Sequence, residues 1–98
     1  MYAVLRRNSF DAERLAAAGE ALREFDALHA SQPGYLGSVV VEQPDRRRLV
    51  LNLWLSEDHA SRALAVLGPE VSRLLGPLMS APSELVGVGH VIATDLTA

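Results

Sequence analysis

The segment from Arg48 to Leu55, RLVLNLWL, constrains the fold more than any other part of this 98-residue sequence. Side chains of a β-strand alternate between the two faces of a sheet, and both alternating sets are mainly apolar in this segment. One set is Leu49, Leu51, Leu53 and Leu55, and the other is Val50, Asn52 and Trp54. A small antiparallel sheet usually exposes one polar face to water. The segment therefore predicts a strand whose sheet is covered on both faces.

The remaining sequence predicts three further strands and a first helix. The strands are expected at 2–7, 35–43 and 84–96, with the opening segment as the third of four. Asn8-Ser9 offers a helix cap, and apolar positions then recur at helical spacing; they are Leu15, Ala18, Leu22, Phe25 and His29. Gly19 lies off this stripe and costs only about 1 kcal/mol against alanine. One continuous helix is therefore expected, ending at Gln32-Pro33-Gly34.

A second helix is expected between the third and fourth strands. Ser56 is its predicted cap, with Glu57 and Asp58 placed favourably in the first turn. Gly68-Pro69 is expected to interrupt the helix, and Gly76-Pro77 to stop its renewed part. The resulting order is β-α-β-β-α-β. It predicts an α+β, ferredoxin-like fold spanning 1–98 as a single domain, with both helices on one face of a four-stranded antiparallel sheet.

The second face of this sheet needs its own cover. Leaving it wet would expose about eight large apolar side chains, each worth roughly 1.5–3 kcal/mol when buried. That sum is comparable to the whole stability of a small domain, about 5–15 kcal/mol. A homodimer is therefore expected, in which two such sheets pack face to face around a shared apolar interior.

Composition narrows the partners and cofactors. The net charge of −3, with Arg46-Arg47-Arg48 as the one basic cluster, argues against nucleic acid. The chain has no cysteine, which removes disulfides, thiolate metal sites and cysteine nucleophiles. No apolar segment approaches the roughly 20 residues of a membrane span, so a cytoplasmic protein is expected. The histidines are scattered and there is no glycine-rich phosphate loop. We therefore expect neither a metal nor a cofactor.

Two segments, SQPGYLGS at 31–38 and LWLSEDHA at 53–60, resemble the antibiotic biosynthesis monooxygenase family. The resemblance covers nearly the whole chain. It implies a dimeric α/β barrel in which each subunit holds a substrate pocket between its helices and its sheet. Some members of the family oxidise phenolic polyketides or quinols with O₂ and use no metal or flavin. In those members the substrate supplies the electrons, and the protein supplies a dry cavity, orientation and hydrogen bonds.

Carried onto this sequence, the resemblance makes Trp54 a wall of the pocket. Asn52 shares its strand face, and Asn52 and Arg73 would bond the substrate oxygens. His90 lies between Val88 and Ile92 and could accept a proton, since an unperturbed histidine titrates near 6.5. Members of the family that degrade haem use a first-strand Asn and a helical His. Arg6 and Ala63-Leu64 stand at those positions, so haem degradation is not expected.

Each of these residues also has a purely structural interpretation. Trp54 could be a core anchor, Asn52 could bond local backbone, Arg73 could be a solvated helix charge and His90 a satisfied buried histidine. His29 could pack at the pocket edge, His59 could lie on the surface and Asn8 could be a cap. Arg6 could pair with a carboxylate or an anionic substrate.

Two functions therefore remain. The first is a cofactor-independent monooxygenase that oxidises a small phenolic or quinol-type aromatic. The second is a non-catalytic dimeric module that binds a ligand or has a structural role. Polar residues converging beside Trp54 would favour the enzyme, and a pocket filled by apolar side chains would favour the module.

Overall fold

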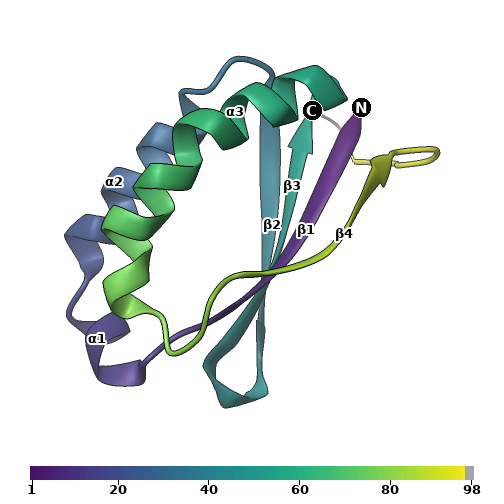
Figure 1. Cartoon of the computed structure of the whole chain (residues 1–98). Helices are drawn as coiled ribbons and strands as arrows, with labels where there is room; N and C mark the ends of the chain where they lie inside the picture. The colour runs from purple at the N-terminus through teal and green to yellow at the C-terminus, as the bar shows by residue number, and fades with distance from the viewer. Residues whose placement is uncertain (97–98) are drawn as a thin grey trace.

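The computed structural model describes residues 1–96 and has the predicted order of elements (Figure 1). The strands are β1 (Tyr2–Ser9), β2 (Tyr35–Gln43), β3 (Arg47–Trp54) and β4 (Glu84–His90). They form one sheet in the order β2-β3-β1-β4, with all neighbours antiparallel. Helices α1 (Ala12–Ala16), α2 (Gly19–Ala30) and α3 (Glu57–Glu70) lie together on one side of it (Figure 1). The α+β, ferredoxin-like fold expected from the sequence is confirmed.

Two clusters of buried side chains join the helices to the sheet. The first consists of Tyr2, Trp54, Ala60, Ala63 and Leu67. The second consists of Phe10, Leu75 and Leu78. Trp54 packs against α3, so its strand row of Val50, Asn52 and Trp54 faces the helices. We call this side of the sheet the inner face. On β1 it carries Tyr2, Val4 and Arg6, since side chains alternate along a strand.

The predicted first helix is wrong in two respects. Asn8 and Ser9 continue β1, where they pair with Arg48 and Arg47, and the cap is Asp11, whose side chain accepts from the backbone N–H of Arg14 at 3.0 Å. The helix also breaks at Ala18, which has the non-helical angles φ −108° and ψ 26°. Leu15, Ala18, Leu22 and Phe25 all pack around the buried Phe10 cluster. The bend thus allows all four side chains to pack on this cluster. Gly19, which follows the bend directly, has the least restricted backbone of any residue type and so accommodates it at low cost.

The second helix is also more continuous than predicted. Gly68 and Pro69 lie inside α3, which passes into a π-helical turn, η2 (Val71–Leu75), and then a 3₁₀ turn, η3 (Gly76–Leu78). Proline removes one helical hydrogen bond, and the wider π turn follows directly after it. This turn buries both Leu74 and Leu75, which lie next to each other in sequence.

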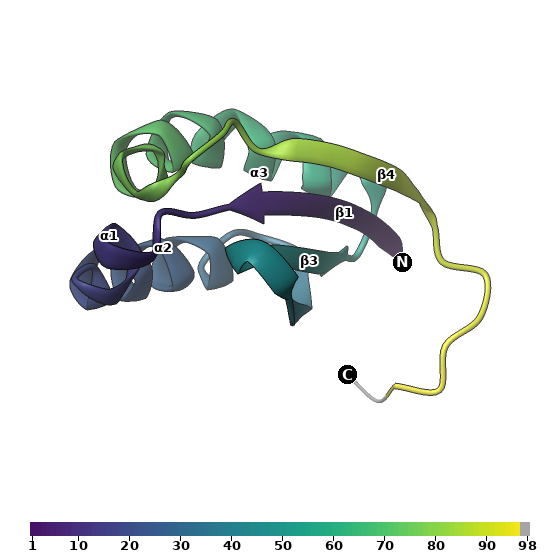
Figure 2. The same ribbon diagram turned by 90° about the horizontal axis from the view of Figure 1, so that it is seen from below.

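The fourth strand is shorter than predicted, because it ends at His90 rather than Leu96. His90 pairs with Tyr2, the first residue of β1, so a longer β4 would have no strand beside it. One further bond joins the N–H of Val91 to the carbonyl of Met1 at 2.9 Å. The chain after β4 then loops out on the side of the sheet opposite the helices and turns back past it (Figure 2), and Ile92 is 98% exposed.

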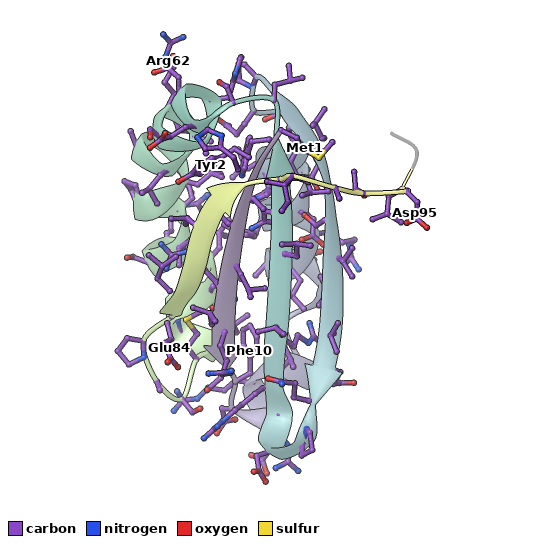
Figure 3. The ribbon with its side chains drawn as sticks, turned by 90° about the vertical axis from the view of Figure 1, so that its right-hand side faces the viewer. Met1, Tyr2, Phe10, Arg62, Glu84 and Asp95 are labelled. Atoms are coloured by element: carbon purple, nitrogen blue, oxygen red, sulfur yellow. The ribbon has the colours of Figure 1, made fainter. Side chains whose placement is uncertain are left out.

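The face of the sheet opposite the helices, the outer face, is apolar in this single chain. Figure 3 looks onto it. Leu49, Leu51 and Leu53 are half-buried, and Val39 and Val41 are 43% and 48% exposed. A hollow of about 200 Å³ lies at one end, lined by Met1, Leu36, Gly37, Ser38, Val39, Leu53, Thr94 and Leu96. The sheet therefore has two apolar faces, as the sequence predicted, and the chain's own helices cover one of them.

Candidate functional site

The candidate site is built around Trp54, the last residue of β3, whose side chain lies on the inner face. Its side chain is 3% exposed. The register places it between Tyr2 on β1 and Tyr35 on β2. Ala60 and Ala63 of α3 belong to the same buried cluster, and their small side chains allow the helix to lie close to the indole. The sequence has one tryptophan, so any optical signal of this residue type reports on this place alone.

Two further aromatic side chains, those of His29 and Tyr35, pack against the indole of Trp54 and form an aromatic cluster with it. His29, in the last turn of α2, lies with its ring centroid 5.4 Å from that of Trp54 and 4.9 Å from that of Tyr35. Tyr35 and Trp54 are themselves 5.5 Å apart with an interplanar angle of 69°. The His29–Tyr35 and Tyr35–Trp54 pairs have the edge-to-face geometry that aromatic rings prefer, and the His29–Trp54 pair is tilted. The end of α2 is thereby held against β2 and β3.

A chain of hydrogen bonds leads from this cluster to Asn52. The Oγ of Ser38 donates to the Oδ1 of Asn52 at 2.6 Å, and the hydroxyl of Tyr35 lies 2.8 Å from the same Oγ. A serine hydroxyl has one proton. Since Ser38 gives it to Asn52, the Tyr35 hydroxyl must donate to Ser38. The amide oxygen of Asn52 is therefore occupied, and its NH₂ group is the part that remains free to donate.

A β-bulge makes this chain possible. Tyr35 pairs with Trp54 and Ser38 pairs with Asn52, while the register shifts between Tyr35 and Gly37. Without the extra residue Leu36, positions 35 and 38 would lie on opposite faces of β2. The bulge brings both hydroxyl groups to the inner face. Among described residues no buried side-chain nitrogen or oxygen lacks a partner, so the Asn52 NH₂ is accessible from outside the protein.

His29 is the titratable group of this cluster. Burial lowers its pKa below the ordinary histidine value, and the nearby Asp26 carboxylate opposes this shift only in part. A lowered pKa keeps the imidazole neutral at pH 7. Neutral imidazole can accept a proton, so His29 has the properties of a general base beside Trp54.

Arg73 lies elsewhere, on the exposed surface of η2. Its Nε donates to Glu70 at 2.7 Å and its Nη2 donates to Glu24 of α2 at 3.1 Å. The hydrogen bond to Glu70 is the main reason that the pKa of Arg73 is raised. The guanidinium therefore ties η2 to α2. It makes no contact with Asn52 or Trp54 among the interactions of the described residues.

His90 also lies apart from Asn52, at the end of β4. Its ring makes an edge contact with Tyr2, with centroids 5.3 Å apart, and its Nε2 is 3.9 Å from a carboxylate oxygen of Glu57. The imidazole is exposed. Tyr2 separates it from Trp54, so His90 flanks the cluster without entering it. Of the four predicted site residues, the structure brings together Asn52 and Trp54 and leaves Arg73 and His90 outside.

The other polar candidates have local partners. Asn8 accepts a hydrogen bond from Ser83 at 2.6 Å. His59 lies with its Nδ1 2.7 Å from the Oγ of Ser56, which caps α3 as predicted.

In the described part of the chain, no three His, Cys, Asp or Glu side chains gather as a metal site would need. No helix within residues 1–96 is long and apolar enough to cross a membrane.

Tyr35 and Ser38 are the site residues that the sequence analysis did not single out. Both belong to the SQPGYLGS segment, so the signal was present. The alternation rule nevertheless separates them onto two faces, and only the bulge reunites them.

Solved structures share this arrangement over nearly its full length. A protein of unknown function from Nitrosomonas europaea has a TM-score of 0.77 at 16% identity and covers 99% of this chain and 94% of its own. An antibiotic biosynthesis monooxygenase has a TM-score of 0.74 at 11% identity, covering 95% of this chain and 100% of its own. A mutant of SnoaB, a cofactor-independent oxygenase from Streptomyces nogalater, has a TM-score of 0.72 at 19% identity, covering 96% and 95%.

The fold is that of the antibiotic biosynthesis monooxygenases. The resemblance drawn from SQPGYLGS and LWLSEDHA is confirmed at this level. No family model matches the sequence, and no curated protein matches it either. The likeness to this fold is thus carried by tertiary structure, since sequence identity to these monooxygenase structures is low.

Proposed function

We propose that this protein is a monooxygenase that oxidises a small phenolic or quinol-type aromatic with O₂ and without a resident cofactor. The observation that carries the proposal is the accessible amide of Asn52, fixed by Ser38 and Tyr35 beside Trp54. The fold shared with SnoaB, described as a cofactor-independent oxygenase, supports the same chemistry.

The reaction needs no external reductant. A phenol loses its proton, and the electron-rich phenolate transfers electrons to O₂. A new carbon–oxygen bond forms at the ring carbon that loses hydrogen. One oxygen atom of O₂ stays in the resulting quinone and the other leaves as water. Phenol plus O₂ thus balances against quinone plus water.

Three side chains receive roles in this proposal. The NH₂ group of Asn52 donates to the phenolate oxygen and stabilises its negative charge. The indole of Trp54 forms the wall against which the ring lies. His29, kept neutral by burial, accepts the phenolic proton. His90 is the second candidate for this base, through its place beside Tyr2. Arg73 receives no role, since two carboxylates already hold its guanidinium.

The functional unit that we propose is a homodimer. A second copy packing on the outer face would bury Val39, Val41 and the leucine row of β3 and would complete an α/β barrel. Multi-angle light scattering after size-exclusion chromatography should give twice the chain mass at micromolar concentration. A chain that stays monomeric there would contradict this part of the proposal.

The alternative function, a dimeric module without catalysis, is favoured by one observation. Trp54 is almost fully enclosed by Tyr2, Ala60, Ala63 and Leu67, as a residue needed only for packing would be. The two functions differ in what a bound phenol does. The enzyme consumes O₂ with it, whereas the module binds it unchanged.

Oxygen uptake with a panel of hydroquinones and anthrones tests the proposal. We expect uptake by the wild type and a loss of about 100-fold in kcat for Asn52→Ala, the usual effect of removing one oxyanion donor. Arg62→Gln changes an exposed residue of α3 and should retain the wild-type rate. Catalase added afterwards should return no O₂, because the second oxygen atom leaves as water and not as peroxide.

Two results would count against the proposal. A folded wild-type protein that consumes no O₂ with any member of the panel refutes the enzyme. Equal rates for the wild type and Trp54→Phe remove the indole from the mechanism.

A further inference from the structure

Arg6 lies on the inner face of β1, away from the aromatic cluster. Tyr2 and Val4 of the same strand pack into the helix-facing core. The register between β1 and β3 is unbroken from Tyr2 to Ser9, so alternation places Arg6 on that side too. Its cross-strand neighbours are Val50 on β3 and Leu85 on β4. A half-buried cation thus sits between two aliphatic side chains.

Among described residues, the guanidinium of Arg6 forms neither an ion pair nor a hydrogen bond. Its neighbours differ in this respect. Arg7, on the outer face, lies 3.5 Å from Glu84 and donates to Gln43 at 3.4 Å. Arg48, on the inner face, lies 3.9 Å from Glu42 and stacks 5.6 Å above the centre of the Phe10 ring. Arg6 therefore keeps its five N–H donors for a partner outside the chain.

The inner face is open where Arg6 lies. Val40, which pairs with Val50 on β3, is 56% exposed although its strand face is turned toward the helices. Val50, Asn52 and Arg6 are only half-buried. The helices therefore close over both ends of the face, at the Trp54 and Phe10 clusters, and cover its middle less completely. A ligand there would meet apolar surface with Asn52 at one end and a free cation at the other.

We infer that Arg6 binds a carboxylate of the substrate, so that the substrate class is a hydroxyaromatic carboxylate. This inference rests on the proposed function, which places the phenolic oxygen at Asn52. Arg6 faces Val50, and Asn52 is the next residue along β3 on the same face. Two residues of strand rise and one strand spacing separate the two α-carbons by about 8 Å. The arginine side chain is long and flexible, so its guanidinium can adjust its reach to the acid group of a phenol whose oxygen lies at Asn52.

The charge of Arg6 gives this contact its strength. Guanidinium and carboxylate form paired N–H···O bonds with matching planar geometry. The half-buried Val50 reduces the screening by water on one side, which strengthens an ion pair, whereas Leu85 on the other side is 52% exposed and shields less. A neutral phenol would leave the cation unsatisfied, so the site should distinguish an acid from its ester.

Anaerobic isothermal titration with para-hydroxycinnamate and its methyl ester tests the inference without turnover. The wild type should bind the acid more tightly than the ester. Arg6→Gln should weaken the acid at least about tenfold, as expected for loss of a charge-assisted hydrogen bond, and should change the ester less than about twofold. The affinity of Arg6→Lys for the acid should lie between those of the wild type and Arg6→Gln, since lysine keeps the positive charge but cannot form the paired hydrogen bonds of a guanidinium.

Arg62→Gln is the matched control. It removes the same charge from an exposed site on α3 whose partner is Asp58, at the edge of the molecule in Figure 3. Both ligands should bind this variant as they bind the wild type. Circular dichroism verifies folding of each variant. Should Arg6→Gln fail to fold, two other measurements decide the question. One is the acid-to-ester affinity ratio of Arg6→Lys, and the other is that ratio for the wild type at rising salt concentration. Salt screens the ion pair, so it should abolish the preference for the acid over the ester.

The inference is overturned if the wild type binds acid and ester equally, or if Arg6→Gln weakens both to the same extent. Such a protein could still oxidise neutral phenols, and the proposed function would then stand without this role for Arg6. A protein that binds neither compound also overturns the inference, and oxygen uptake with the hydroquinone and anthrone panel then decides the proposed function separately.

Discussion

Gly34 ends the loop that leads into β2 and so positions Tyr35 of the candidate site. Its φ angle is +81°, and its carbonyl accepts from the N–H of Leu55 at 2.8 Å. A Cβ atom added at Gly34 would lie 2.4 Å from Cγ and from Cδ2 of the His59 ring. Real Cβ contacts are not this short, so the imidazole or the loop must move. We therefore choose Gly34→Ala as the most informative test of the packing around the site.

The cost of this substitution has two parts. The left-handed backbone costs roughly 1–2 kcal/mol for a residue with a Cβ. Forcing a methyl group into packed space costs typically about 1–3 kcal/mol. Reduced freedom of the unfolded chain returns roughly 0.4–1 kcal/mol. We expect Gly34→Ala to lower the free energy of unfolding by roughly 1–4.6 kcal/mol, which can be a large share of the stability of a small domain.

Urea denaturation followed by the fluorescence of Trp54, the one tryptophan, measures this loss. Gly87→Ala is the matched control. It makes the same chemical change in β4, where no side chain or backbone beyond the two chain neighbours lies within 4 Å of an added Cβ, and the reduced freedom of the unfolded chain predicts a gain of roughly 0.4–1 kcal/mol. The two glycines should therefore respond with opposite signs.

A double-mutant cycle separates the two parts of the cost. In the His59→Ala background the clash is gone, so Gly34→Ala should cost only the backbone strain of roughly 1–2 kcal/mol. If Gly34→Ala is as stable as the wild type, the tight approach of the loop to His59 does not exist in solution. If the cost is unchanged without the imidazole, His59 is not its cause.

Two further predictions concern single residues. Because burial lowers the pKa of His29 in the folded protein, the unfolded chain binds a proton at this imidazole more readily than the folded chain does. The stability of the fold should therefore be constant above the ordinary histidine pKa near 6.5 and should fall as the pH drops below it. Urea midpoints across this range should show a smaller fall for His29→Phe than for the wild type. Asp11→Ala should lower stability by roughly 0.5–2 kcal/mol through loss of the α1 cap, measured by thermal unfolding. Asn8→Ala, at the cap position that the sequence suggested, loses the hydrogen bond from Ser83 but should leave the hydrogen-exchange protection of the α1 amides unchanged.

Much of the site could be read from the sequence because strand alternation is a local rule. Asn52 and Trp54 lie two residues apart, and any strand places such a pair on one face. Tyr35 and Ser38 could not be assigned in this way. Their shared face depends on the extra residue in β2, and no local pattern in YLGS requires a bulge.

Long-range packing decided the positions of Arg73 and His90. The sequence placed Arg73 on the right helical segment, but the π turn at Val71–Leu75 and the carboxylates of Glu24 and Glu70 hold it on the surface. His90 lies on the inner side as alternation predicts, yet its place at the end of the sheet leaves it exposed. His29 entered the cluster because α2 ends over Trp54, which depends on how the helix crosses the sheet.

The sequence by itself determined the order of the elements, the two apolar faces of the sheet and the row that contains Asn52 and Trp54. These features follow from periodicity and composition, which act between near neighbours in the chain. Only the tertiary structure decided where the first helix bends, where β4 ends and which polar groups meet beside the indole. Those features depend on contacts between segments far apart in sequence, such as Phe10 with Leu75, Tyr2 with His90 and His29 with Trp54, whose energies no local stretch of residues contains.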